Sequence, residues 1–417
     1  MSASLRTLGL AALSMVAACG DGLLAPSDAN VPDDGDAQLV RIRLIDGAGG
    51  LPVYFQHEDS TVALATMTDG AGRASAFMSR PGFVTIVGSS MQIITYADVQ
   101  PGDEIVVGDL APVPARTIPI NVRVPSIPAM GYQVLSSCGA TDLLTVPTTI
   151  VMRVERCADT MDVLLVSFDL DEDRNPIPGP RFFQHLRDVP VIELSTIVFG
   201  DTYEREEPGE VIVEGLDDGT QHVSVMQTIM LGRRVAANAV GGMPVDGGIA
   251  RVDVSSLPRT PDLVIQTVVD PWSPESFSVP RAIVWGPGTT ELTVDLAAGP
   301  RAYTERPRFV PEANAIAWAE QPSGEIANIA VARMQWFTIL ASSSWTLVSP
   351  RGEDTSLRFP VLPDPALSPI APFVDRLDSI AYADGYRAFR DLALVDFGQA
   401  LPLRIPAGRI AYRGLRP

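Results

Sequence analysis

The sequence predicts an all-β protein built from several β-sandwich domains in tandem. Three observations predict this. Short apolar runs alternate with polar residues, 36 prolines and 34 glycines are dispersed between them, and no helical pattern extends beyond about two turns. With 417 residues the chain is long enough for about three or four hydrophobic cores, at roughly 100–150 residues each.

Composition narrows the class of partner. The chain is 46% hydrophobic and 19% charged, which is typical of a globular protein. Its net charge of −19 argues against a nucleic-acid partner and against electrostatic docking on anionic lipid. All 31 basic residues are arginines, so Schiff bases, P-loop lysines and Ser–Lys dyads are excluded.

Residues 1–19 are predicted to be a signal peptide. Arg6 precedes the apolar stretch "LGLAALSMVAA", which at about eleven residues is too short to span a bilayer as a helix. The following "VAAC" resembles the bacterial lipobox. That resemblance implies that Cys19 receives diacylglycerol, becomes the new N-terminus and anchors a lipoprotein in the membrane by two or more acyl chains such as palmitate. The alternative is an ordinary signal peptide with an incidental cysteine.

Residues 20–38 are expected to form a flexible acidic tether, because they hold five aspartates and few apolar residues. Gly20 follows the cysteine and Asp21 comes one position later, so the aspartate that retains lipoproteins in the inner membrane is not in its usual place. We therefore expect the outer membrane or the cell surface rather than the inner membrane. No later stretch approaches 18 uninterrupted apolar residues.

The first domain is expected over residues 39–110. "LVRIRLID" alternates apolar and charged residues as a half-buried strand does, and "TMTDGAGRASAFM" has the glycines of a hairpin turn. This stretch resembles carboxypeptidase-regulatory-like and bacterial Ig-like domains, with the resemblance carried by Thr68, Asp69, Gly70, Gly72 and Arg73. It implies an Ig-like or transthyretin-like β-sandwich that serves as a spacer or adhesive module.

The rest of the chain continues the strand pattern. The proline-rich "LAPVPARTIP" is expected to be a linker, and "SIAYADGYRAF" is the clearest predicted hairpin. Strand-plus-proline endings recur at irregular spacing, either as decayed duplications or as ordinary edge-strand stops. We expect a sandwich with a disulfide over 113–192, a sandwich over 193–300 and a C-terminal β domain over 301–417.

Cys138 and Cys157 are predicted to form a structural disulfide. Export would place them in an oxidising compartment, and once Cys19 carries lipid they are the remaining even pair. The alternatives are a metal pair or a reactive thiol, but no histidine is nearby and the spacing matches no zinc pattern.

One acidic run resembles a calcium loop in its spacing. Asp169, Asp171, Asp173 and Asn175 alternate as the oxygen ligands of Ca²⁺ do. Arg174 and Pro180 stand where such a loop needs glycine and glutamate. We favour a solvated acidic hairpin, and apart from this calcium candidate no cofactor is expected.

No catalytic constellation is recognisable in the sequence. The chain has three histidines, none at metal spacing, and no nucleophile elbow, P-loop or dinucleotide fingerprint. We therefore expect a non-catalytic structural, adhesive or binding protein of the cell envelope with a protein or glycan partner. One alternative is a carbohydrate-binding lipoprotein that uses some of the five tryptophans, although tryptophans on strands more often belong to a core. A second alternative is a hydrolase with an unrecognised carboxylate pair.

Overall fold

The computed structural model describes most of the chain from residue 37 onward. The predicted signal peptide, nearly all of the predicted tether and most of the predicted linker lie outside the described residues, and the last three linker residues, 117–119, begin a strand instead. Those described are 37–44, 49–88, 92–107, 117–124, 130–140, 149–155, 159–173, 182–200, 204–231, 234–245, 247–274, 276, 278–297, 299–337, 342–369, 372–382, 392–393, 401–402 and 408–415.

The first sandwich packs a three-stranded sheet, in the order β4-β1-β7, on the four strands β6-β5-β2-β3. Strand β1 alternates exposed arginines with the buried Val40, Ile42 and Leu44, as its sequence predicts. The Asp69 side chain accepts hydrogen bonds from the backbone N–H groups of Ala71 and Arg73 and so fixes the turn before β4. The strands are β1 (Gln38–Leu44), β2 (Pro52–His57), β3 (Val62–Met67), β4 (Arg73–Met78), β5 (Gly82–Val87), β6 (Gln92–Val99) and β7 (Glu104–Val107).

The second sandwich has the same arrangement, with the sheets β11-β8-β14 and β10-β9-β12-β13-β15. Strand β14 pairs with β8, so this sandwich continues past residue 192, where we expected its end. The strands are β8 (Thr117–Arg123), β9 (Met130–Ser136), β10 (Gly139–Ala140), β11 (Thr149–Glu155), β12 (Thr160–Asp169), β13 (Phe182–Pro190), β14 (Thr196–Val198) and β15 (Glu204–Arg205).

The third sandwich repeats the arrangement again, with the sheets β19-β16-β22 and β18-β17-β20-β21. In each of the three, the last strand of the three-stranded sheet pairs in parallel with the first strand of that sheet: β7 with β1, β14 with β8, and β22 with β16. The strands of the third are β16 (Glu207–Glu214), β17 (His222–Leu231), β18 (Arg234–Pro244), β19 (Ala250–Leu257), β20 (Val264–Trp272), β21 (Ser278–Pro287) and β22 (Glu291–Asp295).

The fourth sandwich departs from this pattern in one place. Its sheets are β23-β24-β27 and β26-β25-β28-β31. In the other three sandwiches, one edge of the three-stranded sheet is a final strand that runs parallel to its neighbour. In the fourth sandwich that edge is β23, which precedes its neighbour β24 in the chain and runs antiparallel to it. The elements are β23 (Tyr303–Val310), β24 (Ala315–Glu320), β25 (Ile329–Phe337), β26 (Ser342–Pro350), β27 (Ser356–Arg358), β28 (Phe373–Tyr382), β31 (Gly408–Leu415), the short pair β29 (Leu392–Ala393) and β30 (Leu401–Pro402), and two 3-10 turns, Pro311–Ala313 and Pro365–Leu367.

Three of the sandwiches share one twelve-stranded sheet. It runs β18-β17-β20-β21-β31-β28-β25-β26-β6-β5-β2-β3, and therefore passes from the third sandwich through the fourth into the first. Strand β31 pairs with β21 of the third sandwich, and β26 pairs in parallel with β6 of the first. Strands from opposite ends of the sequence thus lie side by side.

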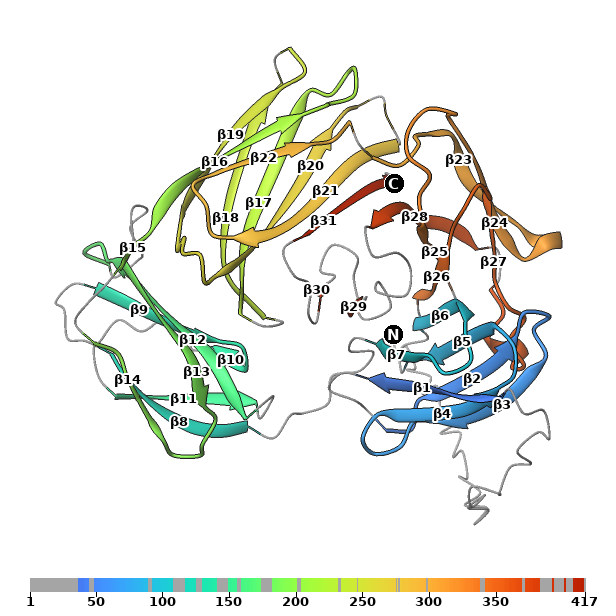
Figure 1. Cartoon of the computed structure of the whole chain (residues 1–417), viewed down its shortest axis with the longest axis horizontal. Coiled ribbons are helices and arrows are strands. Elements are labelled where there is room, and N and C mark those ends of the chain that lie inside the picture. Colours follow the sequence, from blue (N-terminus) through green and yellow to red (C-terminus); the bar gives the residue numbers. More distant parts are fainter. Residues whose placement is uncertain are drawn as a thin grey trace, which may run out of the picture.

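The second sandwich packs on the third through side chains. Leu135, Leu164, Val166 and Phe183 of its larger sheet belong to the same buried cluster as the core of the third sandwich. Figure 1 shows the result: the four sandwiches form an arc, in which the second (teal) lies beside the third (yellow), the third beside the fourth (orange and red), and the fourth beside the first (blue).

The tandem β-sandwich fold predicted from the sequence is confirmed. The described residues contain strands and two 3-10 turns and no α-helix. Across these residues no helix has the length and apolar character needed to cross a membrane. The predicted hairpin "SIAYADGYRAF" is only partly described, because residues 383–391 lie outside the described ranges.

Candidate functional site

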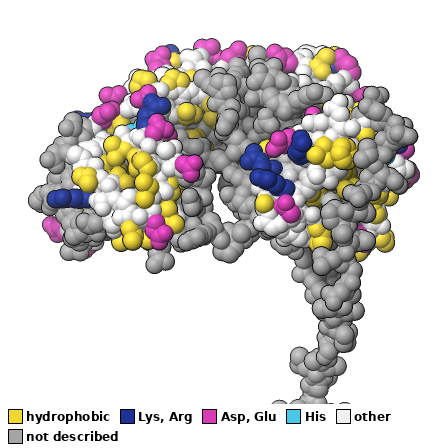
Figure 2. Space-filling view, turned by 60° about the horizontal axis from the view of Figure 1, so that its bottom comes forward, with side chains coloured by type: hydrophobic (Ala, Val, Ile, Leu, Met, Phe, Trp, Pro, Cys, Tyr) yellow, Lys and Arg dark blue, Asp and Glu magenta, His cyan; other side chains and the backbone are white. Residues whose placement is uncertain are grey.

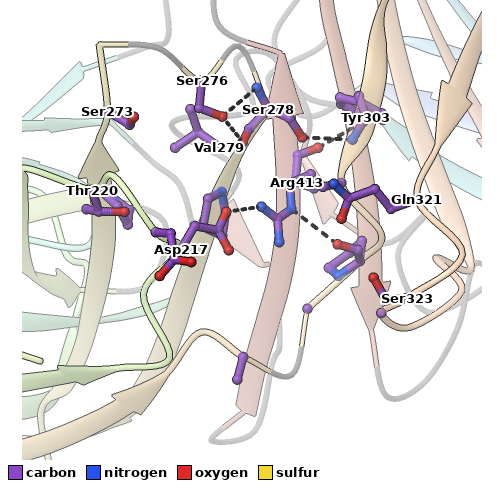
Figure 3. Close-up of a pocket in the computed structure, with 18 residues that line it drawn as sticks. Asp217, Thr220, Ser273, Ser276, Ser278, Val279, Tyr303, Gln321, Ser323 and Arg413 are labelled. Atoms are coloured by element: carbon purple, nitrogen blue, oxygen red, sulfur yellow. Dashed lines mark hydrogen bonds and ion pairs between the residues drawn. The ribbon is translucent and has the colours of Figure 1, made fainter. Parts of the chain in front are cut away.

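A polar cavity of about 530 Å³ lies where the third and fourth sandwiches meet. Its wall is made by the β16–β17 loop, the end of β20, the start of β21, the segment before β23, the β24–β25 turn and β31. Figure 3 shows Thr220 and Ser273 on one side, Gln321 and Ser323 on the other, and Arg413 between them. The cavity therefore lies at the interface between two domains, and it is also the candidate site.

Arg413 on β31 reaches across this cavity. Its Nη1 donates to Asp217 Oδ2 over 2.5 Å, and its Nε donates to the carbonyl oxygen of Pro300 over 3.2 Å. Arg413 is buried, whereas the Asp217 side chain is 44% exposed. This ion pair therefore ties the last strand of the chain to a loop of the third sandwich, and it occupies both groups.

Tyr303, at the start of β23, forms the floor of the cavity. Its hydroxyl lies 2.9 Å from Ser379 Oγ, 2.9 Å from the carbonyl oxygen of Arg413 and 3.2 Å from that of Leu377. Its backbone N–H donates to Ser278 Oγ over 2.9 Å. Burial is the main cause that raises the pKa of this phenol. The hydroxyl consequently stays protonated and acts as a structural donor.

A buried ion pair continues this network into the fourth sandwich. Arg351 Nη1 donates to Ser379 Oγ over 2.5 Å, and the Arg351 guanidinium pairs with the buried carboxylate of Glu320. Trp318 Nε1 donates to the same carboxylate over 2.8 Å, and the guanidinium lies 5.0 Å from the centre of the Trp318 ring. Both charges are thus neutralised and hydrogen-bonded, as buried ions require.

The cavity has a polar lining but lacks an activated nucleophile among the described residues that line it. Neither histidine nor cysteine is among them. Two of the serine hydroxyls that line the cavity are engaged: Ser276 Oγ donates to the carbonyl oxygen of Ser278, and Ser278 Oγ accepts from the backbone N–H of Tyr303. The Asp217 carboxylate is held by Arg413. In chemical terms the arrangement fastens two sandwiches together.

The structure describes only part of the residues predicted as sites. Cys19, Cys157 and Asn175 lie outside the described residues. Cys138 is fully buried in the core of the second sandwich. Its pairing with Cys157 stays a prediction, as does lipidation of Cys19.

The calcium candidate falls at the end of β12. Asp169 is the last residue of that strand, and Asp171 and Asp173 follow in an exposed turn. The described residues bring together no group of three or more histidine, cysteine, aspartate or glutamate side chains suited to a metal ion. With Asn175 outside the described residues, calcium binding stays a prediction.

Four of the five tryptophans belong to hydrophobic cores. Trp285, Trp318, Trp336 and Trp345 are between 2% and 7% exposed. Only Trp272 has a substantial exposed part, at 39%. The tryptophans therefore do not form the sugar-binding surface considered from the sequence. The junction cavity itself was missed, because Asp217, Tyr303 and Arg413 are far apart in the chain and no local pattern connects them.

Comparisons with known proteins add little. No family model matches the chain, and no curated protein matches it. Two solved structures show distant similarity. A candidate adhesin from Bacteroides ovatus is 10% identical over 44% of this chain and 93% of its own, with a TM-score of 0.18. The Bacillus anthracis TIE protein is 8% identical over 62% of this chain and 50% of its own, with a TM-score of 0.14. Similarity this weak carries no argument about function.

Proposed function

We propose that this chain is a non-catalytic binding protein of the bacterial cell envelope, in which a fused frame of sandwiches presents exposed sheet faces to adhesive partners. The observation that carries the proposal is the chemistry of three equivalent surfaces. In each of the first three sandwiches the three-stranded sheet turns one face away from its own core, and the three faces differ in character.

The face on the second sandwich exposes several large apolar side chains next to Arg123 and Thr196. Val151 on β11 and Val198 on β14 are 56% and 58% exposed, and the turn before β14 adds Ile192 and Leu194 at 59% and 67%. Figure 2 shows hydrophobic side chains gathered over the lobe on the left, where this sandwich lies. Leu194 also has a φ of +60°, a conformation that is strained for leucine. An exposed apolar patch with a strained residue is typical of an interaction surface.

The face on the third sandwich is acidic. Glu214, Asp253, Glu291 and Asp295 are exposed on β16, β19 and β22, and Arg251 pairs with Glu210 on the same face. The corresponding face on the first sandwich carries arginines. If the fold required a particular chemistry on the outer face of this sheet, the three faces would resemble one another. We take their difference to mean that each face contacts a different kind of partner.

The location is part of the same proposal. The lipobox resemblance of "VAAC" supports lipidation of Cys19, and Gly20 in place of an aspartate supports the outer membrane or the surface. Anchoring there would place the exposed faces next to glycans and proteins of the envelope or of another cell.

The proposal is tested by displaying the full chain on a non-adherent bacterium. We expect increased retention on host-cell or glycan-coated surfaces, together with radioactive palmitate labelling. Cys19→Ser should abolish the labelling and release the chain from membranes. Equal retention of cells with and without the chain would contradict the binding role. Turnover of ester, peptide or glycoside substrates by the purified chain would support the hydrolase alternative instead.

A further inference from the structure

We propose that the exposed face of the β4-β1-β7 sheet is a binding site for an acidic sugar of a glycan, one that carries carboxylate or sulfate groups. This inference rests on the proposed binding function and names the ligand class and the residues. It is carried by a cluster of arginines, a neighbouring aromatic ring and a carboxylate on a single sheet face.

Three arginines lie together on this face. Arg41 and Arg43 alternate on β1 and Arg73 lies on β4, and all three are exposed. Arg43 stands directly opposite Arg73, and Arg41 stands opposite Ser75. Side chains at alternate positions of a strand are about 6.6–6.8 Å apart, and opposed residues are closer still. A cavity of about 560 Å³ is bounded by these residues.

Their positive charge is only partly balanced, because two carboxylates, Asp69 and Glu104, border the same cavity beside three arginines. Arg43 Nε lies 3.7 Å from Glu104 Oε1, and both side chains are half exposed. Arg41 and Arg73 have no ion-pair partner in the part of the chain that the structure describes. Two like charges directly opposite each other destabilise a sheet. An anion placed between the guanidinium groups would offset that repulsion and could accept bidentate hydrogen bonds.

The fold does not require arginine here. The topologically equivalent face of the third sandwich carries Glu214, Asp253, Glu291 and Asp295 on the same kind of sheet. The cluster also runs against the chain's net charge of −19. In Figure 2 basic side chains gather on the right-hand lobe, where the first sandwich lies, while acidic side chains are scattered over most of the rest of the view.

The other side chains on this face favour a sugar over a simple anion. Phe77 on β4 is 47% exposed, stands opposite Leu39 and is next to Ser75 on the same side of the strand. An aromatic face can pack against the apolar face of a sugar ring. The Glu104 carboxylate and the Ser75 hydroxyl can accept hydrogen bonds from sugar hydroxyls. Anionic groups at one end and hydroxyls over a ring at the other are the features of an acidic sugar.

A nucleic acid fits this face less well. Its phosphates would meet the field of a strongly acidic protein, and a single phenylalanine gives little stacking for successive bases. A neutral glycan would leave the arginines without partners. The site therefore assigns the ligand to acidic glycans.

The experiment is calorimetric titration of the purified full-length chain with four probes at matched length: an oligogalacturonate, a heparin oligosaccharide, a neutral malto-oligosaccharide and an oligothymidylate. We expect one or both acidic sugars to bind, more weakly as salt rises, and the neutral sugar and the oligonucleotide not to bind. Arg43→Gln with Arg73→Gln should weaken binding about tenfold or more. Phe77→Leu should weaken binding of the sugar by a smaller factor without changing its salt dependence.

Arg251→Gln is the matched control, because Arg251 is an exposed arginine on the equivalent sheet of the third sandwich. It should bind as the unchanged chain does. All of these side chains are exposed, so circular dichroism spectra should not change. Equal binding of the arginine pair variant, or oligonucleotide binding as tight as sugar binding, would overturn the assignment. If no acidic sugar binds while displayed cells still adhere, the site is wrong and the proposed binding function stands; if neither is seen, both fail.

Discussion

Several buried polar side chains of this chain lie where one sandwich meets the next. The backbone N–H of Tyr303 bonded to Ser278, and Arg413 bonded to Asp217, link the third and fourth sandwiches, and Thr95 with Trp345 links the first and fourth. Such groups stabilise a structure only when their hydrogen bonds are complete, so each of them specifies how two domains must dock.

Removal of the Tyr303 hydroxyl should destabilise the fourth sandwich, where all the hydrogen-bond partners of this hydroxyl lie. Tyr303→Phe leaves the buried Ser379 hydroxyl and two carbonyl oxygens without this partner, and we expect a loss of about 1–3 kcal/mol in the free energy of unfolding. Urea denaturation followed by tryptophan fluorescence measures it. Tyr54→Phe is the control, because the Tyr54 hydroxyl makes no hydrogen bond to a described residue; equal losses in both variants would contradict the role given to Tyr303.

His185 should make the stability of the chain pH-dependent. Burial is the main cause that lowers its pKa, assisted by Arg187 and opposed by Asp162, Asp262 and Glu204. The folded state therefore binds the proton less tightly than the unfolded chain does. Unfolding takes up a proton as the pH falls below the ordinary pKa of 6.5, so stability decreases there.

The effect of His185 can be measured by denaturation between about pH 7.5 and pH 5.5, across the ordinary histidine pKa. His185→Gln should lose less stability over this range than the unchanged chain. Part of the dependence should remain, because burial and Arg80 also lower the pKa of His57. Two curves of identical slope would show that His185 does not contribute.

At the scale of elements, the two strands nearest the first–fourth junction are covered on both faces. All six residues of β5 are buried: Val84 and Ile86 enter the core of the first sandwich, whereas Phe83 and Val87 enter that of the fourth. Ile93 and Ala97 of β6 likewise pack with the fourth sandwich. One sandwich therefore completes the core of another.

Thr95 lies at the centre of this junction. Its hydroxyl accepts from Trp345 Nε1 over 2.8 Å and is 2.8 Å from Thr85 Oγ1. Thr95→Val keeps the volume but leaves the buried indole N–H unsatisfied, so we expect a loss of about 1–3 kcal/mol and a lower melting temperature by calorimetry. Thr293→Val, at an exposed position of β22, should change little; a similar effect at both positions would contradict the prediction.

Much of this architecture could be predicted from local sequence, and some of it could not. The alternation in β1 predicts one exposed and one buried face, and both are present. The apolar run "GFVTIV" is compatible with any fully buried strand, and nothing in it indicates that two different sandwiches cover it. The parallel pairing of β6 with β26 joins residues far apart in the sequence, so no local turn signal or periodicity predicts it. The alternation of Arg41 and Arg43 in β1 can be seen in the sequence, but the position of Arg73 directly opposite Arg43 is known only from the strand pairing in the sheet.

On the scale of the whole molecule, the junction between the first and fourth sandwiches should hold the first sandwich to the rest of the chain even when the linker after it is cut. A specific protease site placed within residues 108–116 allows the chain to be cut there. We expect the two fragments to elute together in size-exclusion chromatography without denaturant, because the β6–β26 pairing and the shared core hold them. A cut chain carrying Thr95→Val should separate at a lower urea concentration. Fragments that separate spontaneously in buffer would contradict this junction between the first and fourth sandwiches.

The arrangement of the four sandwiches also determines how mechanical load would travel from a membrane anchor. Tension on the N-terminus enters the first sandwich at β1 and can reach the third by two routes, one through the second sandwich and one through the twelve-stranded sheet. Two routes in parallel divide the force, and failure of one leaves the other connected. A tether that held a cell against flow would gain from this arrangement, since the breakage of a single linker would not release the bound partner.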